Sequence, residues 1–355
     1  MPEKVLMKGN EVIAEAAIRA GCRHYFGYPI TPQSEIANYL AWRMPAVGGV
    51  FLQAESEIAA INMVYGASGA GVRVLTTSSS PGISLKQEGI SYIAGAEIPA
   101  VIVNVMRCGP GLGGIMPAQS DYFQAVKGGG HGDYRNMALA PYNAQELYEL
   151  TVKAFDLADK YRMTVMIMAD GALGQMMETV EFRDEEKPFA ADKSWATTGT
   201  DMKRKKNYIT SIYIEPEELE RLNNRLQAKY RTIEENEVMY EERDCEGADI
   251  VVCAFGLAAR IVRNVMEMAA SEGIKVGLLR PITLWPFPTK AISDIAEKTD
   301  VLLSVELNAG QMVEDVRLAV NGRKPVHFYG RTGGVLPTQN EILDEIKRLL
   351  GRGGR

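Results

Sequence analysis

The sequence is poor in the residues that most metal and iron–sulfur proteins need. It has 3 histidines and 4 cysteines among 355 residues. The cysteines form no C-x-x-C pair and have no nearby pair of histidines; they are Cys22, Cys108, Cys245 and Cys253. Structural zinc and iron–sulfur clusters need several converging ligands, usually at short spacings. We therefore expect no metal site on this chain, no disulfide framework, and four buried thiols acting as small apolar side chains.

Long apolar runs and strong charge are also absent. No run reaches the roughly eighteen apolar residues of a membrane span, and the N-terminus "MPEKVLMKGNE" lacks the apolar core of a signal peptide. The formal net charge is −6, which does not suit a phosphate track or a membrane surface. These absences favour a cytoplasmic protein with small-molecule or protein partners and with neither nucleic acid nor membrane.

Several familiar cofactor and catalytic motifs are missing. No G-x-G-x-x-G follows the first expected strand, and there is no P-loop, no G-x-S-x-G and no H-E-x-x-H. The missing dinucleotide fingerprint disfavours a nicotinamide-linked dehydrogenase. The stretch "SSSPGIS", residues 78–84, resembles a phosphate cradle only weakly, and we interpret it as a strand-to-helix turn.

The residues that are present alternate between strand and helix patterns. The runs "AVIVNVM" and "TVMIM" are continuously apolar, as strands of a parallel sheet covered on both faces must be. This alternation predicts an α/β, doubly wound fold. Helical spacing predicts helices over 10–20, from 32, over about 56–69, 84–94, 144–161, 216–229, 257–271, 289–298, 312–321 and 338–350.

The chain length and a shift in composition predict two domains with separate cores. Residues 1–181 would form the first parallel-sheet domain and 246–355 a second, smaller one. Between them, 182–245 carries "RDEEKP", "KRKK" and "EENEVMYEERD". We interpret this segment as a solvated connector or a surface helix pair, because charge runs usually face water.

The stretch "FGYPITPQSEI", residues 26–36, stiffens the junction between a strand and a helix. Pro29 and Pro32 bias the residues before them toward extended geometry, and a proline suits the first position of a helix. We therefore expect Thr31 to cap a helix that begins at Pro32. Open parallel sheets bind ligands at the carboxyl ends of strands, and helix starts attract anions. The stretch predicts a carboxylate-sized socket, with a plain capped turn as the alternative.

Two acids occupy the next strand-to-helix junction, in "FLQAESEIAAINMVYGASGAG". Glu55 and Glu57 are followed by small residues, which permit close approach of another helix or a flat ligand. Acids at a helix start commonly just complement its dipole. A catalytic carboxylate would instead be buried and would have a nitrogen partner.

A cation and a long glycine-rich loop follow a later strand, in "MRCGPGLGGIMPAQSDYFQAVKGGGHGDY". Arg107 emerges at the carboxyl end of the strand, and a guanidinium can grip a carboxylate with two hydrogen bonds. A loop as long as 108–132 inside a compact domain usually has a function. His131 could act as a mobile acid or base, although a solvated loop histidine is the preferred interpretation.

Taken together, these motifs resemble a known family. "GYPITP", "QAESEIAAI", "VLTTSSSPGISL", "MRCGPGLGG", "QSDYFQAVKGGGHGDY", "SVELNAGQMVEDV" and "YGRTGG" are similar to the alpha subunit of the 2-oxoacid:ferredoxin oxidoreductases. The branched-chain, 2-oxoisovalerate type is the most similar. The resemblance covers nearly the whole chain except the charged connector, and it departs from the family at Cys108, where glycine is usual.

The resemblance implies a fold and a set of site residues. The N-terminal domain would bind the aminopyrimidine of thiamine diphosphate, near Tyr28 and Pro29, and the C-terminal domain would resemble the transketolase C-terminal fold. The family's conserved glutamate matches Glu57, which would hydrogen-bond the pyrimidine nitrogen and favour the imino tautomer. Thr31 would donate to the substrate's keto or carboxylate oxygen, and Arg107 would pair with its carboxylate.

The resemblance also implies a reaction and partners. The reaction is oxidative decarboxylation of a 2-oxo acid, with coenzyme A taking the acyl group and ferredoxin the electrons. The chain lacks a G-D-G…N signature for diphosphate and magnesium. A beta subunit would therefore hold the cofactor's diphosphate, Mg²⁺ and an iron–sulfur cluster, and gamma and ferredoxin-like delta subunits would complete the complex. A 2-oxoglutarate-specific relative, which would need another cation, and a noncatalytic scaffold subunit remain alternatives.

Overall fold

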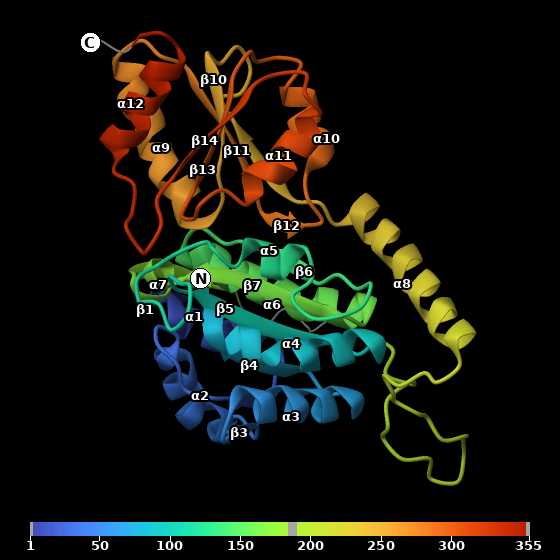
Figure 1. Ribbon diagram of the computed structural model, residues 1–355. Helices are drawn as coiled ribbons and strands as arrows, with labels where there is room; N and C mark the ends of the chain where they lie inside the picture. Colours follow the sequence, from blue (N-terminus) through green and yellow to red (C-terminus); the bar gives the residue numbers. More distant parts are fainter. Residues whose placement is uncertain (1–2, 184–189, 353–355) are drawn as a thin grey trace.

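The computed structural model describes residues 3–183 and 190–352, which form two α/β units stacked one above the other (Figure 1). The larger, N-terminal unit has a seven-stranded sheet that is parallel except for one edge strand. In spatial order its strands are β12 (Thr283–Trp285), β6 (Met137–Leu139), β7 (Thr164–Asp170), β5 (Ala100–Met106), β4 (Val74–Ser78), β2 (His24–Gly27) and β3 (Val50–Gln53). Its helices are α1 (Gly9–Arg19), α2 (Ser34–Ala46), α3 (Glu57–Gly69), α4 (Ser80–Gly95), α5 (Tyr122–Val126), α6 (Ala144–Tyr161) and α7 (Gly171–Gln175).

A five-stranded sheet forms the core of the C-terminal unit, and it too is parallel except at one edge. Its strands, in order, are β14 (Val326–Gly330), β13 (Leu302–Glu306), β10 (Ile250–Cys253), β11 (Val276–Pro281) and β9 (Tyr240–Arg243). Its helices are α9 (Gly256–Ser271), α10 (Thr289–Ile295), α11 (Met312–Val320) and α12 (Gln339–Leu349). A separate two-stranded ribbon pairs β1 (Glu3–Lys8) with β8 (Met177–Phe182). The predicted α/β class with two parallel sheets is confirmed.

The C-terminal unit has a hydrophobic cluster of its own, and another cluster spans both units. Val251 and Cys253 of β10 belong to the same buried cluster as the strands of the N-terminal sheet, whereas Ile250 and Val252 belong to a second cluster under α9 and α12. Alternate residues of a strand point to opposite faces of its sheet. One face of the C-terminal sheet is therefore continuous with the main core. The chain also returns after β11 to add β12 to the N-terminal sheet.

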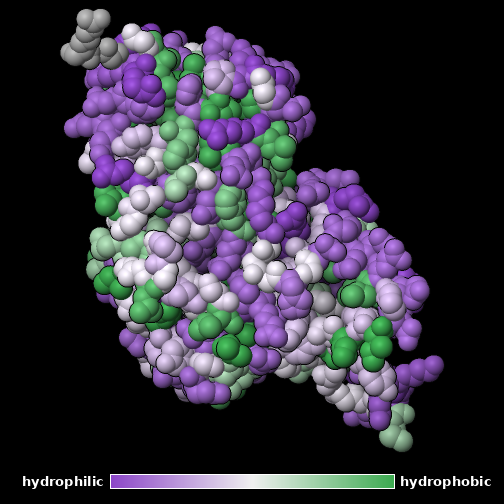
Figure 2. All heavy atoms as spheres, viewed as in Figure 1, coloured by the Kyte–Doolittle hydropathy of each residue, from purple (hydrophilic) through white to green (hydrophobic). Residues whose placement is uncertain are grey.

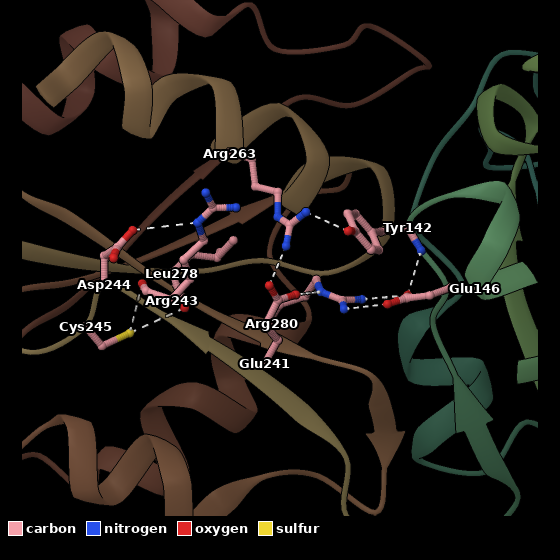
Figure 3. A network of polar contacts seen from close by, with 9 residues as sticks. All are labelled: Tyr142, Glu146, Glu241, Arg243, Asp244, Cys245, Arg263, Leu278 and Arg280. Carbon is pink, nitrogen blue, oxygen red and sulfur yellow. Dashed lines mark hydrogen bonds and ion pairs between the residues drawn. The ribbon is translucent and has the colours of Figure 1, made fainter. Parts of the chain in front are cut away.

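Buried polar contacts fix the two units against each other (Figure 3). Arg280 of β11 is 2% exposed. It donates two hydrogen bonds, of 2.8 and 2.7 Å, to Glu146 of α6 and one of 2.8 Å to Glu241 of β9. Arg263 of α9 donates to the Tyr142 hydroxyl at 2.6 Å and also pairs with Glu241. Removing one partner of a buried ion pair typically costs about 3 kcal/mol or more, so this network holds the units in one orientation.

The charged connector is more structured than its composition suggests. The helix predicted over 216–229 is α8 (Pro216–Asn236), and it buries one stripe, Leu222, Leu226, Tyr230 and Ile233. Before it, Ile209 lies against Gly69 of α3. Large hydrophobic side chains before α8 stay exposed, among them Met202, Tyr208, Ile212 and Ile214. Figure 2 shows hydrophobic residues at the surface of the lower half of the molecule, including the connector region at lower right.

The four cysteines are buried and form no disulfide, as predicted. Burial raises the pKa of the Cys22 thiol to about 12 and that of Cys245 to about 11. Thiols with raised pKa values are poor nucleophiles at neutral pH. Cys22 and Cys245 therefore serve as packing groups.

Candidate active site

The predicted site residues follow neighbouring strands of the N-terminal sheet. Thr31 comes after β2, Glu57 after β3 and Arg107 after β5, and these strands lie in the order β5, β4, β2, β3. Because the strands are parallel, their carboxyl ends share one edge of the sheet. That edge is where open α/β sheets bind ligands.

The prediction that Thr31 caps the next helix is wrong. Helix α2 begins at Ser34 with Gln33 in the capping position. The Pro32 carbonyl accepts from the side-chain amides of Asn10, at 2.7 Å, and Gln175, at 3.3 Å. Since that carbonyl is taken by side chains, Pro32 belongs to a turn, closed by a 3.2 Å bond from Gln33 N–H to the Ile30 carbonyl.

A chain of hydrogen bonds between buried side chains fixes this turn. The Gln33 amide accepts a 2.6 Å bond from the Thr77 hydroxyl and donates to the Tyr28 carbonyl at 3.3 Å. The Tyr25 hydroxyl completes the chain at 2.8 Å from Thr77. Tyr28 is half-buried, while Pro29 and Thr31 are exposed and their side chains are open to a ligand. The Thr31–Pro32 peptide bond is cis.

Glu57 is the buried acid of the second junction. It is the first residue of α3, after the N-cap Ser56, and is 6% exposed, whereas Glu55 is exposed. An ideal Cβ on Gly82 of α4 would lie 2.6 Å from Glu57 Oε1, so only glycine permits this approach. No hydrogen bond or ion pair to the Glu57 carboxylate occurs within 3–183 and 190–352. Buried acids normally have partners, so the Glu57 carboxylate is free to accept from a donor outside the chain.

The turn between β4 and α4 adds further unpartnered groups. The hydroxyls of Ser78 and Ser79 are buried and have no hydrogen-bond partner in the described part of the chain, and Ser78 also lies against Gly82. The Ser80 N–H donates to Asn104 Oδ1 at 3.1 Å. The segment is a strand-to-helix turn, as predicted, and its free hydroxyls suit a polar ligand beside Glu57.

Arg107 reaches across the sheet edge to the turn after β2. It is 8% exposed, and its guanidinium donates to the Thr31 carbonyl at 2.9 Å and to the Leu112 carbonyl at 3.0 Å. Its Nε atom is buried without a partner, and no carboxylate of the described residues pairs with it. Thr31 and Arg107 are thus adjacent, through the threonine backbone, and the cation retains donors for an anion.

A cavity of about 910 Å³ opens beside Arg107, between the two units. Among the described residues that line it, Arg107 is the one cation and Asp121 the one acid. Its lining is Ser80, Pro81, Ser84, Leu85, Arg107, Cys108, Gly109, Pro110, Gly111, Ala118, Ser120, Asp121, Leu307, Asn308, Ala309, Gln311, Thr332 and Gly333. Asp121 accepts from Ser80, at 2.6 Å, and Asn104, at 2.8 Å, and burial raises its pKa.

The glycine-rich loop forms part of this cavity. It is not entirely a loop, because α5 interrupts it. Gln119 ties it to the C-terminal unit by donating to the Phe255 carbonyl at 2.8 Å and accepting from the Leu307 N–H at 3.1 Å. His131 is exposed at the far end of the loop, consistent with a solvated histidine. Cys108 lines the cavity with its thiol buried.

Two charged groups, the half-buried Asp121 and the buried Lys86, were not predicted as site residues. Asp121 lies within the predicted loop, in the N-cap position of α5. Lys86 lay within the predicted helix and is 0% exposed. Its spacing from Gly82 and Gly89 could have indicated a buried position, since residues three or four apart share a helix face.

The comparisons with known proteins decide the family. The profile described as "Pyruvate flavodoxin/ferredoxin oxidoreductase, thiamine diP-bdg" matches residues 15–242, and that of "Pyruvate:ferredoxin oxidoreductase core domain II" matches 248–342. The chain belongs to this family. It is a subunit of a 2-oxoacid:ferredoxin oxidoreductase, with a thiamine-diphosphate-binding domain, as the sequence motifs indicated.

Members of the family differ in their similarity to the chain. The ketoisovalerate oxidoreductase subunit VorB of Methanothermobacter thermautotrophicus is 53% identical over 98% of both chains. The 2-oxoglutarate synthase subunit KorA of the same organism is 37% identical, over 98% of this chain and 100% of the relative. The chain is therefore more similar to the branched-chain type.

Solved structures agree on the fold. The 2-oxoglutarate:ferredoxin oxidoreductase from Magnetococcus marinus, with 2-oxoglutarate, coenzyme A and succinyl-CoA bound, superposes with a TM-score of 0.88 at 27% identity. That match covers 98% of this chain and 66% of the longer one. A split-gene transketolase, at 12% identity and a TM-score of 0.61, shares the fold alone. No helix in the described parts of the chain has the length and apolar character needed to span a bilayer.

Proposed function

We propose that this chain supplies the pyrimidine-binding half of the active site for CoA-dependent oxidative decarboxylation of a branched-chain 2-oxo acid. The observation that carries the proposal is Glu57, which is 6% exposed at the sheet edge and whose carboxylate has no hydrogen-bond partner among the described residues. An acid that serves only to stabilise a helix start would not need to be buried without a partner.

The residues around Glu57 offer polar groups to an aminopyrimidine. Gly82 lets Glu57 Oε1 and the Ser78 hydroxyl pack closely against α4, and the hydroxyls of Ser78 and Ser79 have no hydrogen-bond partner among the described residues. Glu57 would hold the ring nitrogen and exchange a proton with it, while the turn with Tyr28 and Pro29 would flank the ring. When bound, thiamine diphosphate supplies the nucleophilic carbon and the electron sink for decarboxylation.

Arg107 and Thr31 are proposed to hold the substrate. The guanidinium is already fixed by two backbone carbonyls, so it loses little freedom when it pairs with a carboxylate. The exposed Thr31 hydroxyl follows the carbonyl that Arg107 contacts, and it would donate to the keto or carboxylate oxygen. Fixing both ends of a small 2-oxo acid in this way would orient its keto carbon.

The substrate is proposed to be a branched-chain acid such as 2-oxoisovalerate. The cavity beside Arg107 has no second cation for the distal carboxylate of 2-oxoglutarate. Its wall includes the apolar side chains of Leu85, Pro110 and Leu307, which match an aliphatic branch. We expect kcat/KM for 2-oxoisovalerate to exceed that for 2-oxoglutarate at least about tenfold, because the second carboxylate would be desolvated without a partner. Equal values would favour the 2-oxoglutarate type.

Partner subunits would complete the enzyme. We propose that a beta subunit holds the diphosphate, Mg²⁺ and an iron–sulfur cluster, with gamma and ferredoxin-like delta subunits, and that coenzyme A and ferredoxin are the acceptors. Within the described residues, no three His, Cys, Asp or Glu side chains come together as metal ligands. Ile58 of α3, 50% exposed beside Glu57, is a candidate contact for the beta subunit.

The deciding experiment replaces Glu57 in the complex purified with its native partners. Glu57→Gln keeps the shape of the side chain but cannot exchange a proton, so we expect kcat to fall at least about a hundredfold. Glu55→Gln, an exposed acid two residues away, is the matched control and should retain full turnover. Viologen reduction with 2-oxoisovalerate measures both. Undiminished turnover in Glu57→Gln would reject the proposed role and favour a scaffold subunit.

A further inference from the structure

Lys86 of α4 is a fully buried lysine to which none of the roles above is assigned. Its side chain is 0% exposed, and its ammonium donates to Thr76 Oγ1 at 3.0 Å. No carboxylate within the described residues forms a direct ion pair with it. A buried ammonium with one neutral partner is costly to maintain. Such a group is a candidate for function rather than for packing.

The crossing of α3 and α4 places Lys86 and Glu57 at the same helix interface. An ideal Cβ on Gly82 would lie 2.6 Å from Glu57 Oε1, and one on Gly89 would lie 2.5 Å from Ile61 Cγ2. Lys86 stands between these glycines, one turn from each, and therefore shares their face of α4. Helical side chains lean toward the N-terminus of their helix. Lys86 thus leans toward the Gly82 end, where Glu57 lies.

Glu57 is the charged group that acts on Lys86 in this interior. Burial lowers the pKa of Lys86 to about 8, and attraction to Glu57 opposes that shift. At pH 7 the lysine is therefore mainly charged. The other titratable groups on elements packed around α4 include Tyr65 on α3, Tyr25 on β2, Arg107 after β5, Asp121, His131 and Tyr134 in or just after the loop, and Asp170 on β7. None of these contributes to the shift at Lys86.

We propose that Lys86 is a positioning residue that keeps Glu57 ionised before the cofactor binds. The proposal rests on the proposed function, in which Glu57 meets the pyrimidine nitrogen. Two buried side chains of opposite charge, neither with an ion-pair partner in the described chain, face one helix crossing. The ammonium compensates the carboxylate through the low-dielectric interior without contacting the ligand itself.

The charge state of Glu57 decides whether the complex takes up a proton when the cofactor binds. The free pyrimidine is unprotonated at neutral pH. If Glu57 is ionised in the cofactor-free complex, binding that places a proton between the carboxylate and the ring nitrogen must take that proton from solvent. If Glu57 is already protonated, no uptake is needed. Lys86 therefore sets how many protons accompany binding.

Calorimetry of the native complex measures this number. The complex is stripped of cofactor and titrated with thiamine diphosphate and Mg²⁺ at pH 7, in buffers of different ionisation enthalpy. The difference in proton uptake between wild type and Glu57→Gln isolates the proton at residue 57 and removes that of the diphosphate. We expect this difference to be about one proton per site in the wild type and near zero in Lys86→Met.

A matched control excludes a general packing effect. Gln87→Met changes the adjacent buried polar side chain, 7% exposed, to the same residue without removing a charge. It should retain the uptake of the wild type, as should Thr76→Val, which removes the hydrogen bond of Lys86 but not its charge. Loss of uptake in Gln87→Met would mean that packing, not charge, is responsible, and would overturn the proposal.

The outcomes separate this inference from the function on which it rests. If Glu57→Gln retains turnover, the proposed function fails. If Glu57→Gln loses turnover but Lys86→Met takes up protons as the wild type does, the function stands and the role of Lys86 is rejected. A wild type that takes up no more protons than Glu57→Gln rejects it as well, because Glu57 would then be protonated with the lysine in place.

Discussion

Two buried glutamates, each at the carboxyl ends of the strands of one sheet, differ in the hydrogen bonds of their carboxylates. Glu306 ends β13 and is 0% exposed. It accepts three backbone N–H groups at the start of α11, at 3.1, 2.8 and 2.8 Å, and a 3.1 Å bond from the Ser304 hydroxyl. Glu57 also lies at a helix start and is nearly as buried, yet its carboxylate has no such bond among the described residues.

The contrast separates an acid that maintains the fold from one available for chemistry. Carboxylates that accept several N–H groups gain charge-assisted bonds that repay their desolvation. Asp170 of β7 is a similar case, because it accepts from the N–H groups of Ala172 and Leu173 at 2.9 and 3.1 Å. Glu57 instead is compensated only at a distance, by Lys86. An unpartnered buried acid therefore indicates function more strongly than burial alone does.

The most severe test of the comparison measures both local stability and turnover in a variant of each glutamate. Glu306→Gln places an amide N–H₂ against backbone donors, so we expect local stability to fall by about 3 kcal/mol. Hydrogen exchange of peptides covering 302–320 in the complex measures this loss. Turnover per assembled complex should fall far less than in Glu57→Gln, which should leave exchange unchanged. Glu57→Gln lowering exchange protection as much as Glu306→Gln would remove the distinction.

Much of the fold could be predicted because local patterns decide it. The helix predicted over 144–161 has those bounds, since Asn143 caps it and its apolar stripe is regular. The short strands β9 and β12 were missed, because each is defined by pairing with a partner distant in sequence. The start of α2 was misplaced because Asn10 and Gln175, far along the chain, bind the Pro32 carbonyl.

The candidate site could be predicted in part for the same reason. Strand ends give Thr31, Glu57 and Arg107, because topology brings them to one edge. Their roles stay predictions. Lys86 was not foreseen, since a lysine in a helix usually faces water, and only the approach of α3 at Gly82 and Gly89 reveals its burial.

A smaller effect is predicted for Lys86, whose burial should make the local stability depend on pH. The folded-state pKa of Lys86 is lowered from 10.5 to about 8. Between these values the unfolded chain binds more protons than the folded one, so stability rises with pH through this window, and the full cost of the buried charge applies below it. We expect Lys86→Met to increase the local stability of β4 and α4 by about 2 kcal/mol at pH 7.

That gain should decline as the pH rises above about 8, because the wild-type lysine then becomes neutral in the folded state. Hydrogen exchange of peptides covering 74–95, corrected for the intrinsic rate at each pH, measures the gain at pH 7 and at pH values above this point. Gln87→Met provides the pH-independent baseline. A lysine that merely packs would make Lys86→Met destabilising at every pH. If Lys86→Met is more stable than the wild type and also lacks the proton uptake assigned to Glu57, then the wild type maintains this buried charge at a cost to its own stability.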